Sequence, residues 1–408
     1  MMRFGLMYRN RAVAAMLATA AVALAACTPA PIPASVAPTP AVQIGATTQV
    51  LPGPGIPADA PLLQANNNLD VIESGGSRYL AIRSSLVHFA TPLTKIIVFR
   101  SDDHGVTWRT EAIEDRGRDL REPRFLDLHG KLFLYFFEAG TNPFAFEPGR
   151  VLAIERQSGG TWTTPVVVSP DDAVDWRTKT INGVPYMMRY RGGEDSYASG
   201  EAAITVEMLT TTNGYDWTPL NPARPVVHTG GAGETDFAFD NSGRLWSVMR
   251  NEAGEKGHFG SLLCSAPPTD ITDWTCSYDP RKFDSPLVFS HNGEIWLLAR
   301  RQVANGGRYD LGASFLDRDQ QLLVNQAAYW VTPKRLALWK VDTTRGVVNW
   351  VADLPSRGDT AFPGIVWTGP NSLTVYNYSS PPGDDNIAWV AGQLGPTNIY
   401  STPLTLPS

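Results

Sequence analysis

The sequence predicts an all-β protein, a six-bladed β-propeller with four antiparallel strands in each blade. Three observations predict this fold. The 408 residues include 36 glycines, 32 prolines and 12 tryptophans, a composition typical of short strands joined by tight turns. A hairpin pattern recurs six times along the chain, and a tryptophan-containing turn recurs in phase with it. Repeats of this size predict units that pack side by side around a ring.

Each hairpin begins with an acidic or mixed-charge segment and a short apolar strand, then has a polar turn and a second strand. Four of the second strands end in arginine. Because such a hairpin runs out and back, we expect its two ends to meet on the same face of the ring. The first strand of each hairpin should line the central channel. The six hairpins are expected at residues 70–83, 121–138, 175–189, 234–250, 284–300 and 359–378.

The second repeat is a turn that we place between the third and fourth strands of a blade. Ser101–Trp108 fits the pattern Ser-x-Asp-x-Gly-x-Thr-Trp without a mismatch, and weaker copies end at Trp162, Trp217 and Trp274. The four tryptophans follow the acidic starts of their hairpins by 38, 40, 42 and 40 residues, an offset that chance would not easily maintain. We expect Asp103 to cap its own turn and to have no catalytic role.

Blades five and six depart from the regular pattern. In blade five the outer strands are expected at Leu336–Val341 and Val347–Val351, which leaves an insertion near Arg301–Pro333. Blade six is short of strands. The segment Val42–Val50 is expected to supply its outer strand and to close the ring.

The N-terminal region is typical of an export signal. Three arginines precede a short apolar stretch that ends in Leu-Ala-Ala-Cys, which resembles a bacterial lipobox. We therefore expect a signal peptide at 1–26, a lipid on Cys27 and a cell-envelope location on the outer-membrane, periplasmic or surface side. An ordinary cleaved signal is the alternative. Residues 27–61 are rich in proline and predict an extended tether, and 62–408 form the propeller.

Composition excludes several classes of function. The net charge of −6 gives no basic excess for nucleic acid. Nucleotide-binding loops, dinucleotide fingerprints and Gly-x-Ser-x-Gly elbows are absent from the sequence. The six histidines lack metal-ligand spacing, and we expect surface or core roles for them. We expect no metal, no cofactor and a monomer. Cys264 and Cys276 are expected to form a disulfide, with two buried thiols as the alternative.

The charged ends of the hairpins carry the candidate chemistry. Arginines offer forked donors that suit a carboxylate, and carboxylates suit acid–base work. Aromatic residues at the rim, with Trp176, Tyr376 and Tyr378 as candidates, would stack on sugars. The alternative for each arginine is a structural salt bridge between blades. The candidate arginines are Arg83, Arg121, Arg177, Arg189, Arg250 and Arg300, and the candidate carboxylates are Asp70, Glu122, Asp175, Glu234, Asp284 and Asp359.

The turn, the six hairpins and the arginine-ended strands together resemble the sialidase superfamily of BNR-repeat (Asp-box) propellers. The stretches Asp119–Pro123 and Gly358–Gly364 carry a closer resemblance to bacterial exo-α-sialidase-like proteins. The resemblance covers about residues 65–400. It implies an arginine clamp for a substrate carboxylate, formed by Arg83, Arg250 and Arg300. It also implies Asp70 or Asp175 as the acid/base, and Tyr378 with Glu234 as the nucleophile pair. A uronic acid or a furanoside would suit the same chemistry as sialic acid.

Three functions follow from these residues. The leading hypothesis is a surface-anchored, exo-acting glycoside hydrolase on terminal, anionic sugars, working through an oxocarbenium-like state. A polysaccharide lyase, with arginine neutralising a uronate and Tyr or His removing a proton, is the second. A glycan-binding lipoprotein without catalysis is the third. In each case the partner is carbohydrate, and contact with a membrane is through the lipid only.

Overall fold

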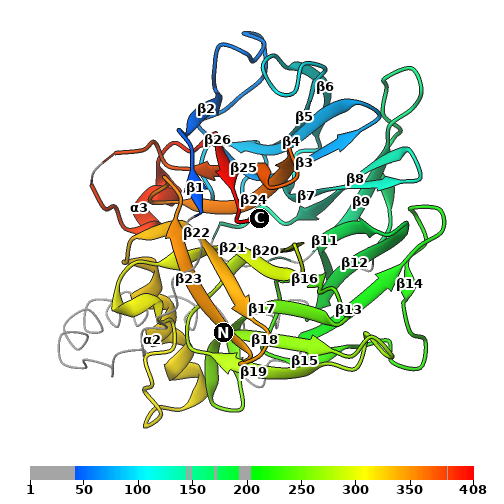
Figure 1. Cartoon of the computed structure of the whole chain (residues 1–408). Helices are drawn as coiled ribbons and strands as arrows, with labels where there is room; N and C mark the ends of the chain where they lie inside the picture. Colours follow the sequence, from blue (N-terminus) through cyan, green and yellow to red (C-terminus); the bar gives the residue numbers. More distant parts are fainter. Residues whose placement is uncertain (1–41, 144–146, 148, 170–171, 193–203, 384) are drawn as a thin grey trace, which may run out of the picture.

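The computed structural model describes residues 42–143, 147, 149–169, 172–192, 204–383 and 385–408. The predicted signal peptide and the lipidation residue Cys27 lie outside these residues. The described chain forms six separate antiparallel sheets arranged around a centre (Figure 1). This is the predicted six-bladed β-propeller, with four consecutive strands as the basic unit of a blade.

Blades one to three follow one another along the chain. Blade one contains β3 (Ala65–Ser74), β4 (Ser77–Ser85), β5 (Lys95–Ser101) and β6 (Arg109–Asp115). Blade two contains β7 (Asp119–Leu128), β8 (Lys131–Ala139), β9 (Arg150–Glu155) and β10 (Val166–Val167). Blade three contains β11 (Ala173–Ile181), β12 (Val184–Arg191), β13 (Ile204–Thr210), β14 (Thr218–Pro219) and a short extra strand, β15 (His228–Gly230).

Blades four to six complete the ring. Blade four contains β16 (Thr235–Phe239), β17 (Leu245–Glu255), β18 (His258–Ala266) and β19 (Thr275–Asp279). Blade five contains β20 (Asp284–His291), β21 (Glu294–Gln302), β22 (Lys334–Asp342) and β23 (Val347–Asp353). Blade six contains β24 (Thr360–Trp367), β25 (Ser372–Ser379) and β26 (Asn398–Thr405), together with β1 (Gln43–Ile44) and β2 (Thr48–Leu51).

The ring closes through strands from both ends of the described chain. Both β1 and β2 pair with β26 in antiparallel fashion, with Gln43 opposite Thr405 and Thr48 opposite Ser401. Figure 1 shows the two blue strands beside the red one. The predicted role of segment 42–50 is confirmed. The ring thus includes strands from the range 27–61 that we assigned to the tether.

The insertion in blade five carries helical structure. Between β21 and β22 lie the short 3-10 helix η2 (Asn305–Gly307) and the helix α2 (Arg318–Trp330). Asp317 caps α2 by accepting from the backbone N–H of Gln320, whose side chain in turn accepts from the Asp317 N–H. A second helix, α3 (Trp389–Leu394), lies between β25 and β26. No helix in the described parts is long and apolar enough to cross a membrane.

The apolar core lies between neighbouring blades. Leu263 and Trp246 of blade four pack with Val288, Leu297 and Trp339 of blade five in one buried cluster. Similar clusters join blades one and two, and blades five and six. Each blade therefore depends on its neighbours to bury both of its faces, which is the reason that the sheets close into a ring.

Two local devices stabilise the outer strands. In the turn Ser101–Trp108, the Asp103 carboxylate accepts from the backbone N–H of Thr107 at 2.9 Å and from its hydroxyl at 2.6 Å, so Asp103 caps its own turn as predicted. In blade four, Cys264 and Cys276 are directly opposite on β18 and β19 and are joined by a disulfide.

Candidate functional site

One edge of the ring collects the charged ends of the inner hairpins. In antiparallel register, Asp175 lies opposite Arg189 and Asp284 lies opposite Arg300. The backbone N–H of Arg250 donates to the carbonyl of Glu234. We call this edge the mouth. The loop 86–94 in blade one, the insertion with α2 in blade five and α3 in blade six each lie between the second and third strands of their blade and reach the same edge.

Each arginine that ends a hairpin is paired with a carboxylate. The Arg250 guanidinium lies 2.6 Å from Glu234, Arg300 lies 2.8 Å from Asp284, and Arg189 lies 2.5 Å from Asp175. The fourth, Arg83, binds the carboxylate of Asp119 in the next blade at 2.8 Å, and both side chains are fully buried. These arginines therefore have a structural role at the mouth, because each one neutralises a buried carboxylate.

The Nη1 and Nη2 groups of Arg83 are already bound by protein acceptors, while Nε is buried without a hydrogen-bond partner in the described part of the chain. Besides Asp119, the guanidinium donates to Asn67 Oδ1 and to the backbone carbonyls of Val87 and Phe89. Arg121 is more open, because its side chain is 19% exposed while it donates to Asp119 and to the His88 carbonyl. Of these two arginines from the Asp119 cluster, Arg121 is the better placed for a ligand.

Asp70 and Arg177 lie in a deeper layer of the channel. A β-bulge between Asn67 and Asp70 shifts the register, so Asp70 is opposite Ala81 and does not reach the level of Arg83. Its carboxylate accepts from the backbone N–H of Phe125 at 2.8 Å and lies 3.8 Å from Arg177. Burial raises the pKa of Asp70, against the opposing charges of Arg124 and Arg177.

Blades four and five share a network of charges at the mouth. Arg250 contacts Glu234, Glu252 at 3.3 Å and Asp284 at 3.8 Å. Lys282 bridges Glu252 and Asp284 at 2.7 and 3.5 Å. Burial alone would raise the pKa of Asp284, but these cations and Arg300 outweigh it and lower the pKa. Asp284 therefore stays ionised and acts as the anionic hub of the network.

The insertion places an aromatic residue in this network. Tyr329, from the end of α2, is fully buried and donates its hydroxyl to Asp284. Arg300 Nε donates to the same hydroxyl oxygen at 3.1 Å. The ammonium groups of Lys282 and Lys334 lie 4.1 and 3.8 Å from the centre of the ring, close enough for cation–π attraction. The insertion is thus built into the site.

Glu122 has the most unusual environment of the mouth carboxylates. Its backbone φ is +54°, in the left-handed region that residues with a Cβ rarely adopt. Oε1 accepts from Asn68 at 3.2 Å, while Oε2 is buried without a hydrogen-bond partner, 3.9 Å from Arg124 Nη2. Burial raises the pKa of Glu122 to about 7, and the charge of Glu234 adds to this effect. The carboxyl group therefore holds a proton near neutral pH.

Glu234 faces the same region but is held more firmly. Oε1 is bound by Arg250 and Oε2 accepts from the backbone N–H of Ser285 at 2.7 Å. Burial raises the pKa of Glu234 against the opposing charge of Arg250. Because each glutamate charge is felt by the other, the first proton lost by this pair makes the second harder to remove.

Tyr378 is fully buried, and its hydroxyl donates to Asp359 at 3.2 Å. The partner that the structure gives Tyr378 is therefore Asp359, where the resemblance implied Glu234. Asp359 also accepts from Trp389 Nε1 at 3.0 Å and binds His88 Nδ1 at 2.6 Å. Burial would raise the pKa of Asp359, but His88, Arg300 and the Trp389 hydrogen bond lower it.

Two of the aromatic candidates do not lie at the rim. Trp176 is 1% exposed and packs against Phe362, with the Arg124 guanidinium 4.8 Å from its ring centre. Tyr376 is buried, and its hydroxyl oxygen accepts from Arg78 at 2.9 Å, near the opposite edge of the ring. The prediction that Trp176 and Tyr376 stack on sugars at the rim was wrong, because both side chains fill the interior. Tyr378 is also fully buried and exposes no ring face to a sugar.

Sequence reasoning missed several mouth residues. His88 comes from the loop between β4 and β5, Trp389 begins α3, Tyr329 lies in α2 of the insertion, and Asp119 precedes Glu122 on β7. His88, Trp389 and Tyr329 lie outside the hairpin repeat. Asp119 and Lys282 directly precede predicted site segments, which is the one signal that would have found them. Within the described residues, no group of His, Cys, Asp or Glu has the geometry of a metal site.

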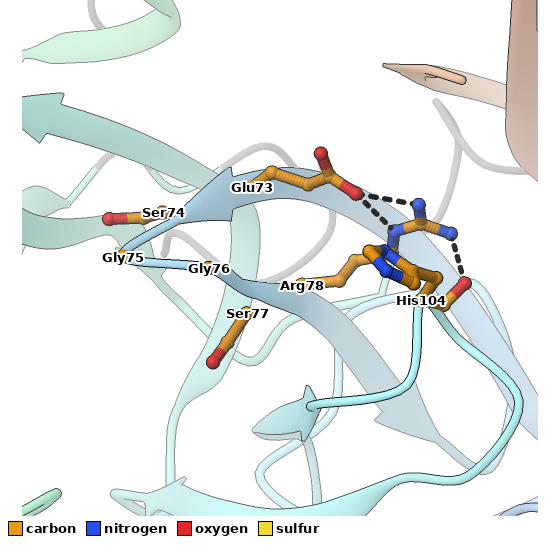
Figure 2. A pocket seen from close by; sticks show the side chains of 7 residues that line it. All are labelled: Glu73, Ser74, Gly75, Gly76, Ser77, Arg78 and His104. Atoms are coloured by element: carbon orange, nitrogen blue, oxygen red, sulfur yellow. Dashed lines mark hydrogen bonds and ion pairs between the residues drawn. The ribbon is translucent and has the colours of Figure 1, made fainter. Parts of the chain in front are cut away.

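A small cavity of about 180 Å³ lies at the opposite edge of blade one. It is formed by the β3–β4 turn, Arg78 and His104 (Figure 2). Arg78 donates to Glu73 and to the His104 carbonyl, so its positive charge is already paired with a protein carboxylate. None of the predicted site residues lines this cavity, and the chemistry of the chain is concentrated at the mouth.

Fold and mouth together define a six-bladed propeller whose polar site lies at one end of the central channel. No family model and no curated protein matches the chain. The chain is similar to a solved Dyadobacter fermentans protein of unknown function, with a TM-score of 0.62 and 14% identity over 90% of this chain and 100% of that one.

It is also similar to Trypanosoma rangeli sialidase in complex with sialic acid (TM-score 0.53, 10% identity, 83% of this chain). The match spans 54% of the sialidase chain, about half of its length. Penicillium chrysogenum α-L-arabinanase complexed with arabinobiose gives a TM-score of 0.51 and 14% identity over 89% of this chain and 98% of that one. At such identities, these likenesses show a shared propeller fold.

Proposed function

We propose that this chain is an exported, surface-anchored glycoside hydrolase that removes terminal, anionic sugars from glycans. The observation that carries the proposal is Glu122, a strained and buried glutamate at the mouth whose pKa is raised to about 7. A general acid works best when its pKa lies near the working pH. Glycosidases that use paired carboxylates keep one of them protonated in this way.

In the proposed reaction, Glu122 donates its proton to the glycosidic oxygen as the bond to the anomeric carbon breaks. In its ionised form, Glu234, which is paired with Arg250 at 2.6 Å, stabilises the positive charge that develops on the sugar ring. The two glutamates come from blades two and four. Their surroundings differ, since Glu234 has a bound guanidinium and Glu122 Oε2 has no hydrogen-bond partner in the described structure, and this difference favours Glu122 as the proton donor.

The substrate class is inferred from the remaining donors. The Arg121 side chain is 19% exposed at the mouth, and its Nη1 can bind a sugar carboxylate while Nε and Nη2 stay bound to Asp119 and the His88 carbonyl. The loop 86–94 and α3 meet beside it, since the His88 N–H donates to the Gln393 carbonyl. Crowding on this side favours a pocket that admits the end of a glycan. The sialidase and arabinanase neighbours act on or bind sugars according to their titles, which supports a carbohydrate partner.

Anchoring at the cell envelope is proposed from the sequence alone. The signal-like residues 1–26, the lipobox cysteine and the proline-rich segment after it favour a lipoprotein. Mass spectrometry of the mature protein tests this. A diacylglyceryl group on Cys27 is expected, and a mature chain that begins elsewhere would contradict it.

The function is tested by screening the full chain in detergent against aryl glycosides and acidic polysaccharides. Glu122→Gln is expected to lower kcat about 10²–10⁴-fold on substrates with poor leaving groups. The loss should be much smaller with a dinitrophenyl leaving group, which needs no proton. Glu207→Gln is the matched control, because Glu207 is another half-buried glutamate at the mouth edge.

The alternative functions give different results in the same screen. A lyase would release a product that absorbs in the ultraviolet, and a binding protein would retain glycan without cutting it. Equal activity of wild type and Glu122→Gln on all leaving groups would rule out the proposed acid.

A further inference from the structure

His88 lies at the mouth, in the loop 86–94 between β4 and β5. Its backbone N–H donates to the Gln393 carbonyl at 3.1 Å, and its carbonyl accepts from Arg121 Nη2 at 2.8 Å. The loop is thereby held between α3 and β7. The imidazole Nδ1 lies 2.6 Å from Asp359 Oδ2.

Asp359 fixes the imidazole and is hidden behind it. The carboxylate is fully buried and is also bound by Tyr378 and Trp389, so it cannot turn away. A carboxylate that accepts from Nδ1–H leaves the lone pair on Nε2. The His88 side chain is 14% exposed, and among the described residues its Nε2 has no hydrogen-bond partner. The basic atom of this pair therefore faces the solvent at the mouth.

The other carboxylates at the mouth are occupied. Both oxygens of Glu234 are bound, by Arg250 and by the Ser285 N–H. Asp119 is bound by Arg83 and Arg121, and Asp175 by Arg189 and Ser169. A proton acceptor for the reaction must therefore be sought elsewhere.

We infer that His88 is the general base of the hydrolysis proposed above, with Asp359 as its positioning residue. This inference rests on the proposed function. A water molecule attacks the anomeric carbon, and its proton moves to His88 Nε2 as the new C–O bond forms. The glycosidic C–O bond breaks with both electrons on the leaving oxygen, which takes the proton of Glu122. The imidazolium then returns a proton to Glu122 through solvent, and the enzyme is restored.

The charges around the two groups suit these roles. Burial lowers the pKa of His88 and outweighs Asp359, which raises it, while Arg121 and Arg83 lower it further. Tyr378 packs beside the imidazole with ring centres 6.2 Å apart, and its own pKa is raised well above the usual value by burial, so it stays neutral. With the pKa of Glu122 raised to about 7, one pH range keeps Glu122 protonated and His88 neutral.

The test is the pH dependence of kcat/KM for the full chain and four variants, on a substrate that the screen identifies. The wild type should give a bell, with Glu122 setting the alkaline limb near pH 7 and His88 the acidic limb, displaced to lower pH by the lowered pKa of its imidazole. His88→Asn should lose about 10²–10⁴-fold in kcat and the acidic limb. Asp359→Asn should lower kcat by favouring the wrong tautomer. His104→Asn, on the opposite edge, should match the wild type.

The stereochemistry of the product gives a second readout. Direct attack by water inverts the anomeric centre, which proton NMR of the first-formed sugar reveals. Retention, or an acidic limb that survives His88→Asn, would overturn the role of His88. If Glu122→Gln is impaired in those same assays, the hydrolase function itself stands. A wild type that cuts nothing in the screen would overturn both proposals.

Discussion

Blades three and four carry the same hairpin pattern, an acidic start and an arginine end, but use it differently. In blade three, the described partners of Asp175 are Arg189 from the same blade and Ser169 from the segment that leads into it. In blade four, Arg250 binds Glu234 and also reaches Glu252 and Asp284, which connects it to blade five. Both arginines are buried. The difference shows that a shared sequence pattern does not fix a shared role.

The cause lies in the neighbouring carboxylates. The Asp175–Arg189 pair cancels its own charge. Around Arg250, three carboxylates compete for the charges of Arg250, Lys282 and Arg300, and burial leaves Glu234 with a raised pKa. Competition of this kind is typical of active sites, whereas a cancelled pair is typical of structural ion pairs.

The largest expected effect is a difference in catalytic activity between variants of the arginines in blades four and five and a variant of the arginine in blade three. Arg250→Ala and Arg300→Ala should lower kcat/KM at least 10²-fold, because they release Glu234 and Asp284 from the geometry that the reaction needs. Arg189→Ala should leave the activity per folded molecule nearly unchanged. Kinetics on folded fractions purified by size exclusion would check this. Equal losses in blades three and four would remove the distinction.

The second effect is on stability. Arg189→Met leaves Asp175 buried without its partner, and breaking such a pair costs about 3–5 kcal/mol. Urea unfolding of the variant measures this cost. The control is Arg301→Met, because the Arg301–Asp353 pair is part-exposed (18% and 28%) and should contribute less than about 1 kcal/mol. A smaller loss for Arg189→Met than for Arg301→Met would contradict a structural role for blade three.

The third effect is the pH dependence of stability. Since the pKa of folded Glu122 is raised to about 7, the folded state holds this proton more tightly than the unfolded state. The wild type should therefore lose stability as the pH rises from about 4.5 to about 7, by at most about 3 kcal/mol relative to Glu122→Gln. Urea midpoints at several pH values would test the sign. Parallel curves for the two proteins would show that Glu122 titrates normally.

The smallest effect on function is expected from the disulfide. The two cysteines are 12 residues apart in sequence. Removing the disulfide should lower the free energy of unfolding by about 3 kcal/mol, because the unfolded chain then gains conformational entropy. Because Cys264 and Cys276 lie on the outer strands of blade four, Cys264→Ser with Cys276→Ser should retain kcat/KM. Thermal unfolding and kinetics of this double variant would show whether the site depends on the inner strands alone.

The fold could be predicted because the same sequence pattern recurs in each blade of a propeller. Each blade needs the same turns and the same alternation, so two weak repeats in phase located six hairpins. Within a hairpin, register also predicted contacts, and Asp284 does lie opposite Arg300. One extra residue at the bulge before Asp70 was enough to move that side chain to a deeper layer. Bulges of this kind leave no clear mark in a single sequence.

Contacts between blades could not be predicted in the same way. The Arg83–Asp119 pair joins two blades, and His88 meets Asp359 across 271 residues of sequence. Tyr329 enters from an insertion that has no counterpart in the repeat. Such pairings depend on how the blades pack and on the conformation of long loops. Local pattern and hairpin geometry carry no information about either.

The joining of β1 and β2 to β26 has a consequence for how the ring forms. Blade six contains β1 and β2 from the start of the described chain and β26 from its end. During synthesis, β1 and β2 therefore have no pairing partner in blade six until β26 has been made. A shortened chain that starts at Leu62 would leave β26 as a bare edge with unpaired backbone groups, open to association with other chains. Trimming for solubility should therefore stop before Val42.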